Sequence, residues 1–353
     1  MAKSQFQTLT LALYDEMRAA EAENLFWRNL FSVEDVANTR KVEIDVMRGE
    51  RNIAVDVKRG GGLTNRNLAS TWSGKEYEVP LYSESSPLNA DMLNKRIPGQ
   101  DPYAPISQME AMAYWAAKLQ AENTAKIMRA ENLMGAQACQ SGTITLKNTD
   151  TIDFAKRSEL TVTPGTKWDN SGDPITDFGT LIDRLYQYGR RKPKIAVFGT
   201  DAWDSFITNA IVKAYIGDSQ YIDAARISPG EIRNGALFQG RIKLKSGPLD
   251  LYVDDSYYEE SGTPTKYLDK DTVVVMDPDA RLVRAYGATE VLEAAREEYD
   301  QSGMPPVPQM VPGTYVPWMR TEYPSLLEAG VQSAPILVPV AIDTIGTLSA
   351  VNT

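Results

Sequence analysis

Residues 107–140 read SQMEAMAYWAAKLQAENTAKIMRAENLMGAQACQ, and this stretch decides the predicted architecture. It contains no proline and one glycine, Gly135, and its apolar residues follow a spacing of three and four that Asn123 interrupts. Those residues are Met109, Met112, Ala116, Leu119, Ile127, Ala130, Leu133 and Met134. The pattern predicts one amphipathic helix of about 34 residues, roughly 50 Å long. Its heptads are too irregular for a clean coiled coil.

A long β-hairpin is predicted upstream of this helix. Apolar residues alternate with polar ones on both sides of a glycine-rich turn, which is the two-residue period of a strand. They are Ile53, Val55 and Val57 before Gly60-Gly61-Gly62, and Tyr77, Val79 and Leu81 after it, and Val42, Ile44 and Val46 alternate in the same way further upstream. We expect residues 48–82 to form one extended loop. Its apolar face needs a covering surface, because a two-stranded hairpin is marginal alone in water.

The rest of the chain predicts a mixture of helices and strands. Residues 6–31 are predicted to be helical, four prolines between 83 and 105 predict a linker, and the proline-rich residues 303–317 predict a rigid loop. Helices are expected over 178–188 and from Thr200 to about 212, and a hairpin is expected to turn at Gly247-Pro248. Further strands are expected over residues 143–146, 159–163, 194–198, 272–276 and 335–340, the last returning to an earlier sheet. The predicted class is α+β.

Composition excludes several kinds of chemistry. The chain has no histidine, so it lacks the commonest general base and the commonest metal ligand. Its one cysteine, Cys139, cannot form an intramolecular disulfide and is expected to be a small buried residue. The formal net charge of −10 and the scattered basic residues disfavour sequence-specific DNA binding. No run of 18 apolar residues exists, so no membrane span is expected.

Acidic pairs are the strongest hint of an enzyme, and we interpret them as surface or turn residues. They occur at Asp254-Asp255, Glu259-Glu260 and Glu297-Glu298. Neighbours on a strand point to opposite faces, so adjacency does not place two carboxylates across a substrate. Asp277 and Asp279 flank Pro278, and a turn that ends a strand explains them as well as a cation site does. The three glycines at 60–62 lack the other residues of a phosphate-binding loop.

The order of these parts resembles that of the major capsid proteins of tailed bacteriophages, in particular the phage lambda-like branch. Short stretches are similar too. They are Arg157-Ser158-Glu159 with Gly165-Thr166-Lys167-Trp168, Ile195-Ala196-Val197-Phe198 with Trp203, residues 281–287 with Arg284-Ala285-Tyr286-Gly287 at their end, and Gln332-Ser333-Ala334-Pro335. Each stretch is short, but together they follow one order along essentially the whole chain.

The resemblance implies the Hong Kong 97-type capsid fold. It implies an N-terminal arm over residues 1–47, the extended loop over 48–82 and a peripheral domain over 83–175 with its spine helix at 107–140. An axial domain would span 176–300, and residues 301–353 would return to the peripheral domain. The extended loop would make the contacts between subunits through Ile53, Val55, Val57, Arg59, Gly60, Gly61, Gly62, Arg66, Tyr77, Val79 and Leu81.

The function implied by the resemblance is assembly and not catalysis. Pentamers and hexamers of the chain would form the icosahedral shell of the virion in the host cytoplasm, around a separate scaffold protein, with a portal and in some phages a decoration protein. The shell would enclose double-stranded DNA without reading its sequence and would need no cofactor. Lys–Asn crosslinks from Lys58 or Lys75 to Asn65 or Asn67 are not expected. Two alternatives stay open: an encapsulin-like compartment, which would hold protein cargo, and a soluble α+β hydrolase, which would purify as a monomer.

Overall fold

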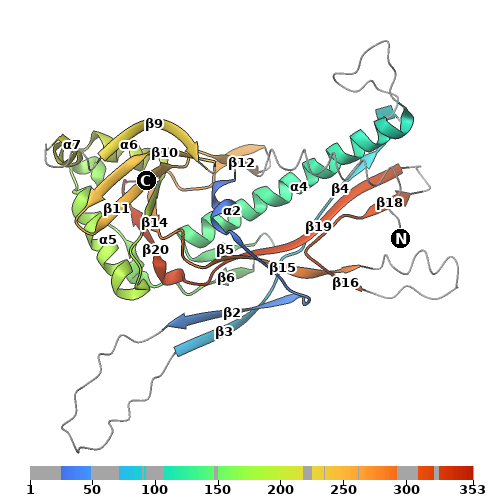
Figure 1. Ribbon diagram of the computed structural model, residues 1–353, viewed down its shortest axis with the longest axis horizontal. Coiled ribbons are helices and arrows are strands. Elements are labelled where there is room, and N and C mark those ends of the chain that lie inside the picture. The colour runs from blue at the N-terminus through green and yellow to red at the C-terminus, as the bar shows by residue number, and fades with distance from the viewer. Residues whose placement is uncertain are drawn as a thin grey trace, which may run out of the picture.

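The computed structural model describes residues 25–48, 71–89, 91–92, 107–146, 150–217, 225–233, 235–260, 262–291, 309–321 and 326–352. These residues form an elongated molecule (Figure 1). A long helix and a long sheet fill one half, and a compact sheet flanked by shorter helices fills the other.

The predicted long helix is confirmed. Helix α4 spans Gln108–Gln140 and begins with a capping box, in which Ser107 accepts from the backbone N–H of Glu110 and Glu110 accepts from that of Ser107. Cys139 is fully buried within it, as expected. The helix packs along strand β19 (Leu326–Pro339) and strand β4 (Tyr82–Leu88), so one of its faces meets a sheet of the same chain.

The larger sheet is built around β19. Strand β15 (Leu282–Val291) pairs antiparallel with one end of β19, and β1 (Val33–Val36) lies parallel to β15. Strands β16 (Gln309–Pro312), β17 (Thr314–Tyr315) and β18 (Trp318–Thr321) extend the same sheet. The prediction of a rigid loop over residues 303–317 is therefore wrong for residues 309–315. Prolines are tolerated there because edge and terminal positions of strands need no N–H donor.

The smaller sheet has seven strands in the order β7, β20, β14, β8, β11, β10, β9. Their bounds are Thr161–Val162, Ile345–Ser349, Thr272–Met276, Ile195–Phe198, Gly247–Val253, Ala236–Leu244 and Ala225–Arg233. Helices α5 (Pro174–Gly189), α6 (Thr200–Thr208) and α7 (Ala210–Gly217) accompany it. Beneath them lies an aromatic cluster of Trp168, Phe178, Phe198, Trp203 and Phe206.

The two central strands explain why two short segments of the sequence are apolar at every position. Alternate residues of β8 and β14 enter different cores. Val197 and Val274 belong to the core shared with α4, whereas Phe198 and Val275 belong to the core beneath α5 and α6. A strand buried on both faces has no polar side, so it shows a continuous apolar run.

Several boundaries differ from the predictions. Strands β7 and β20 pair in the smaller sheet, a pairing that their sequences did not predict, since a strand's partner depends on tertiary packing and not on its own pattern. The turn between β10 and β11 lies at Lys245-Ser246, and Gly247 already begins β11. Helix 200–212 breaks at Asn209, whose side chain accepts from the N–H of Ile211 and so caps α7.

Three hairpins complete the described chain: β2 (Lys41–Arg48) with β3 (Thr71–Glu78), β5 (Thr143–Thr145) with β6 (Thr151–Asp153), and β12 (Tyr257–Glu260) with β13 (Thr263–Lys266). Short helix α2 (Phe26–Leu30) precedes β1, and the remainder of the helix predicted over residues 6–31 lies largely outside the described residues. Among the helices described, none is both long enough and apolar enough to cross a bilayer.

Candidate assembly surfaces

The root of the extended hairpin lies on the body of the subunit. The β2–β3 ladder begins at Lys41 opposite Glu78, so residues predicted to end the N-terminal arm form the first strand of the hairpin. In this register Val42 is opposite Tyr77, and Ile44 is opposite Lys75. Figure 1 shows the hairpin leaving one side of the molecule, away from α4.

Val79 belongs to the subunit core and not to a contact surface. Its side chain is only 7% exposed and joins the core beneath α4. A Cβ added at Gly287 would lie 3.3 Å from the Cβ of Val79, so β15 approaches closely here. The sequence predicts no cover for this residue within the hairpin itself, and in the subunit β15, distant in sequence, covers it. Leu81, two residues on, is 58% exposed.

Charged residues surround the root. Arg40 pairs with Glu78 at 2.7 Å and with Glu290 at 3.3 Å, and all three side chains are at least half exposed. These residues and Leu81 line a groove of about 350 Å³. Thr289 also lines it, and its buried hydroxyl has no hydrogen-bond partner among the described residues. The groove places an exposed apolar side chain beside an excess of carboxylates, which is a surface that a neighbouring chain can cover.

The other predicted contact residues of the loop lie outside the described residues. They are Ile53, Val55, Val57, Arg59, Gly60, Gly61, Gly62 and Arg66. Tyr77 lies in β3, and only its backbone position is described. Their contact roles stay predictions.

A buried polar network anchors the start of the described chain. The indole N–H of Trp27 donates to Asp254 at 2.6 Å, and Arg28 forms an ion pair with Glu131 of α4. Both Arg28 and Glu131 are at most 7% exposed. Burial raises the pKa of the Glu131 carboxyl, and the Arg28 guanidinium opposes that shift. The network fixes α2 against α4 and β11, so the arm leaves the body at a defined point.

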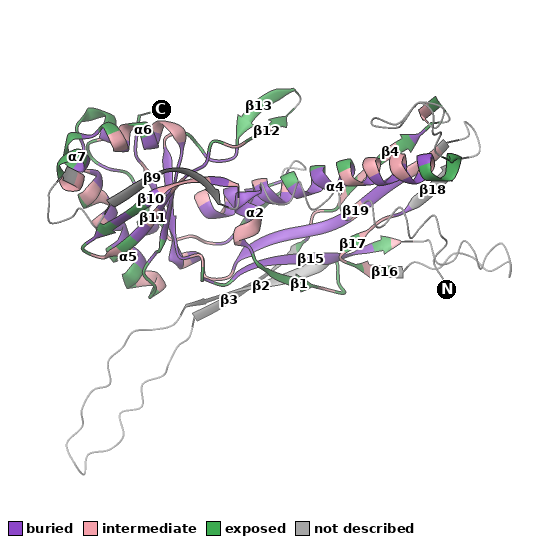
Figure 2. Cartoon of the chain, turned by 45° about the horizontal axis from the view of Figure 1, so that its top comes forward, coloured by how far each residue is buried: buried purple, intermediate pink, exposed green. Residues whose placement is uncertain are grey.

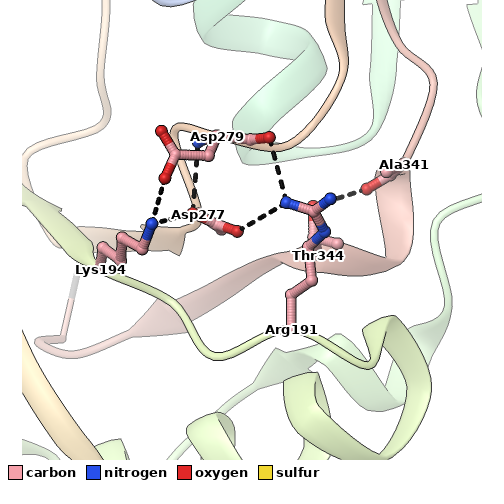
Figure 3. Close-up of polar contacts among 6 residues, drawn as sticks. All are labelled: Arg191, Lys194, Asp277, Asp279, Ala341 and Thr344. Atoms are coloured by element: carbon pink, nitrogen blue, oxygen red, sulfur yellow. Dashed lines mark hydrogen bonds and ion pairs between the residues drawn. The ribbon is translucent and has the colours of Figure 1, made fainter.

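Asp254, Asp277 and Asp279 have structural partners, as expected of turn residues, whereas Glu259 and Glu260 are exposed on β12 and the predicted pair Glu297-Glu298 lies outside the described residues. Asp254 is buried and accepts from the backbone N–H of Ser256 at 3.0 Å, which caps the turn after β11. Asp277 accepts from the N–H of Asp279 and lies near two cations, Arg191 at 3.3 Å and Lys194 at 3.7 Å (Figure 3). Lys194 also pairs with Asp279. Within the described part of the chain, no three potential ligands of the His, Cys, Asp or Glu type lie close enough to hold a metal.

With this geometry in place, similarity to known proteins decides the family. A family model described as phage major capsid protein E matches residues 12–349. The chain belongs to this family.

Relatives of the capsid protein E family extend the likeness over the whole chain. The major capsid protein of Escherichia phage lambda is 22% identical in an alignment 351 positions long, which covers 95% of this chain and 96% of that protein. The crystal structure described as a capsid protein of an Escherichia coli CFT073 prophage has a TM-score of 0.59 at 16% identity over 92% of both chains. The cyanophage A-1(L) capsid subunit has a TM-score of 0.52 at 14% identity over 94% of both chains. The fold is therefore the Hong Kong 97-type capsid fold, an α+β fold as predicted.

Membership in the capsid protein E family makes this chain a structural protein of the virion, a subunit of the phage head. This confirms the predicted function and location, and it favours a phage head over the two alternatives of an encapsulin-like compartment and a hydrolase.

Sequence reasoning missed the residues that hold the arm and the hairpin root. Trp27 and Asp254 are 227 positions apart, and Arg28 and Glu131 are 103 apart. Nothing local distinguishes either pair. One signal was available: Trp27 lies in the apolar cluster Leu25-Phe26-Trp27, and an indole N–H that is buried needs an acceptor.

Proposed function

We propose that copies of this chain assemble as pentamers and hexamers, around a separate scaffold protein, into a closed head that encloses double-stranded DNA, and that residues 48–82 form the main contact between neighbours. The observation that carries the loop's role is its position. Strands β2 and β3 pair only with each other among the described strands, and they leave the body of the subunit (Figure 1). Apart from Val79, which β15 covers at the root, no strand of either described sheet pairs with the hairpin, so a neighbouring copy is the available partner.

The proposal also gives the chain no catalytic role. Histidine is absent, Asp277 is paired with a cation, and Asp254 accepts from a turn N–H group. A portal and a decoration protein would be further partners at the vertices and on the surface of the shell.

Co-expression with the scaffold protein tests the proposal. We expect closed particles tens of nanometres across, on the order of 10² copies each, visible in negative stain and sedimenting far faster than the free subunit. The matched control is the chain without scaffold, which should give fewer or irregular particles. A single small sedimenting species in both preparations would contradict the proposal.

A further inference from the structure

The hairpin of β12 and β13, here called the tongue (residues 257–266), stands apart from both sheets. Figure 2 shows it projecting from the body, coloured as exposed. Its two strands pair with each other alone among the described strands. Tyr257 is 63% exposed, a large value for an aromatic side chain. A two-stranded hairpin of this kind is marginally stable in water unless another surface covers it.

The base of the tongue is firmly held, so its direction is set by the fold. The rings of Tyr258 and Tyr267 lie 5.1 Å apart, and Tyr267 is only 5% exposed. Asp254, just before the tongue, accepts from Trp27. Because register pairs Tyr257 with Lys266 and Glu259 with Pro264, these four residues share one face, the face opposite Tyr258. That face is exposed throughout.

The tongue and the residues leading into it carry excess negative charge. Asp255, Glu259 and Glu260 are exposed, against one lysine, Lys266, whose amine donates to the carbonyl of Asp255 at 2.9 Å. The extended loop has the opposite balance. Residues 57–75 include Lys58, Arg59, Arg66 and Lys75 and contain no acidic residue, in a chain whose net charge is −10.

The two segments also lie on opposite sides of the subunit. In both Figure 1 and Figure 2, β12 lies on the side of α4 away from β2 and β3. Side-by-side copies in a ring make head-to-tail contacts, in which one side of a subunit meets the opposite side of its neighbour. A basic segment on one side and an acidic, uncovered hairpin on the other suit such a contact.

We propose that the tongue is the docking surface for residues 57–75 of a second copy of this chain. The inference rests on the proposed assembly into a shell and names the partner surface of the extended loop. Carboxylates of the tongue pair with the loop's arginines and lysines, and an arginine stacks over the exposed ring of Tyr257. The contact covers the exposed face of the tongue and neutralises part of the subunit's charge.

Charge exchange tests the pairing. Glu259→Lys with Glu260→Lys on the tongue, and Arg59→Glu with Arg66→Glu on the loop, should each lower the yield of shells about tenfold or more. All four changes together should restore much of the yield, because the opposite charges meet again. The control is Asp183→Lys with Asp204→Lys, two exposed carboxylates on α5 and α6, which should not be rescued by the loop reversal. Shells that form normally with the reversed tongue would overturn the inference and leave the proposed function intact.

Disulfide trapping gives a second, direct readout. Cys139 is fully buried, so it should not form disulfides that compete with a cysteine pair introduced at the surface. Asn65→Cys and Thr263→Cys, combined in one chain and assembled, should give linked multimers on a non-reducing gel, whereas each single variant should stay monomeric. Glu259→Cys in place of Thr263→Cys allows for a shifted register. Intact shells without linkage in either combination would overturn the inference, and an absence of shells from the wild-type chain would instead contradict the proposed function.

Discussion

Asn123 is the polar residue that interrupts the apolar stripe of the long helix, and it is fully buried. Its amide donates to the carbonyl of Ala329 at 3.1 Å, and it accepts from the hydroxyl of Ser86 at 2.9 Å. The side chain therefore joins α4 to both β19 and β4. The sequence marked the position as an exception, but it could not name the partners, which lie 206 and 37 positions away.

Replacing Asn123 with leucine should cost stability. The change leaves the Ser86 hydroxyl without its acceptor and forces a branched side chain between two strands, so we expect a loss of about 1–3 kcal/mol in the free energy of unfolding. Chemical denaturation of the free subunit measures it. Glu122→Gln, on the exposed face next to it, is the control and should change stability by less than about 0.5 kcal/mol. Equal stability of the two variants would show that the buried amide contributes nothing.

Lys156 is the second residue with an unexpected role. Its amine donates to the carbonyls of Cys139 and Gln140, which end α4, and contacts the hydroxyl of Thr347 in β20 at 2.5 Å. A cation at a helix C-terminus is favourable. Burial nevertheless lowers the pKa of Lys156 to about 8 from 10.5.

This shift predicts the sign of a pH effect. Between pH 8 and 10.5 the unfolded chain holds a proton on this lysine that the folded chain has lost, so raising the pH across that window stabilises the fold through this group. Compared with a Lys156→Met variant, the wild type should gain stability from pH 8 to pH 10.5. Unfolding of both proteins at a series of pH values measures the difference between their free energies of unfolding. The contributions of the other titratable groups cancel in that difference. A difference that falls with pH would contradict the assigned shift.

At the scale of elements, local pattern predicted what is local. The bounds of α4 match the sequence prediction to one residue, because its stripe and its capping box lie within the segment itself. The cover of the hairpin root was not predicted, because Val79 is buried against Gly287, which lies some 200 positions away in the sequence. The partners of β20 were not predicted for the same reason, since they too are distant in the sequence.

Gly135 shows how α4 is adapted to its neighbours. A Cβ there would lie 3.1 Å from Leu337 and 3.2 Å from Trp27, so the glycine allows α2 to approach the helix. Gly135→Leu should destabilise the subunit by about 1–3 kcal/mol, because overpacking displaces α2. Gly179→Ala in α5 is the matched control: nothing lies within 4 Å of its added Cβ, and it should stabilise by about 0.5–1 kcal/mol. Thermal melts of both variants measure this, and a stabilised Gly135→Leu would refute the close approach.

The extended loop gives a prediction with a sharp boundary. Replacing residues 49–70 with a short Gly-Ser linker should leave a folded subunit with a cooperative melt, because the described residues already form two extensive cores without that segment. The same protein should not form shells. A second variant, in which the linker replaces residues 51–79, also removes Val79 from the core. It should have a lower stability than the first variant.

Sedimentation with scaffold and circular dichroism compare the two deletions. Shells built by the shorter deletion would show that the loop is not the main contact. Equal melts of both deletions would show that Val79 contributes nothing to the core.

At the scale of the whole molecule, the mixture of helical and strand patterns predicted the α+β class, and the resemblance in the order of elements predicted the fold. The continuous apolar runs of β8 and β14 indicate strands that are buried on both faces. They do not show that the two faces belong to two different cores, because that depends on the distant elements that pack against each face.

The single buried cysteine also predicts how the shell is held. Mature particles boiled in detergent should release one band near 39.1 kDa with or without reductant. A ladder that persists in reductant would reveal covalent crosslinks, and substituting Lys58 or Lys75 would then identify the lysine.

Strand β20 has a consequence for synthesis on the ribosome. It follows every other described strand in the chain, yet it lies inside the smaller sheet, between the short edge strand β7 and β14. A nascent chain thus exposes the edge of β14 until residues 345–349 emerge, and the smaller core stays open until then. Translation that stops early yields a fragment without this closing strand, and chaperones or proteases meet that fragment before any growing shell does.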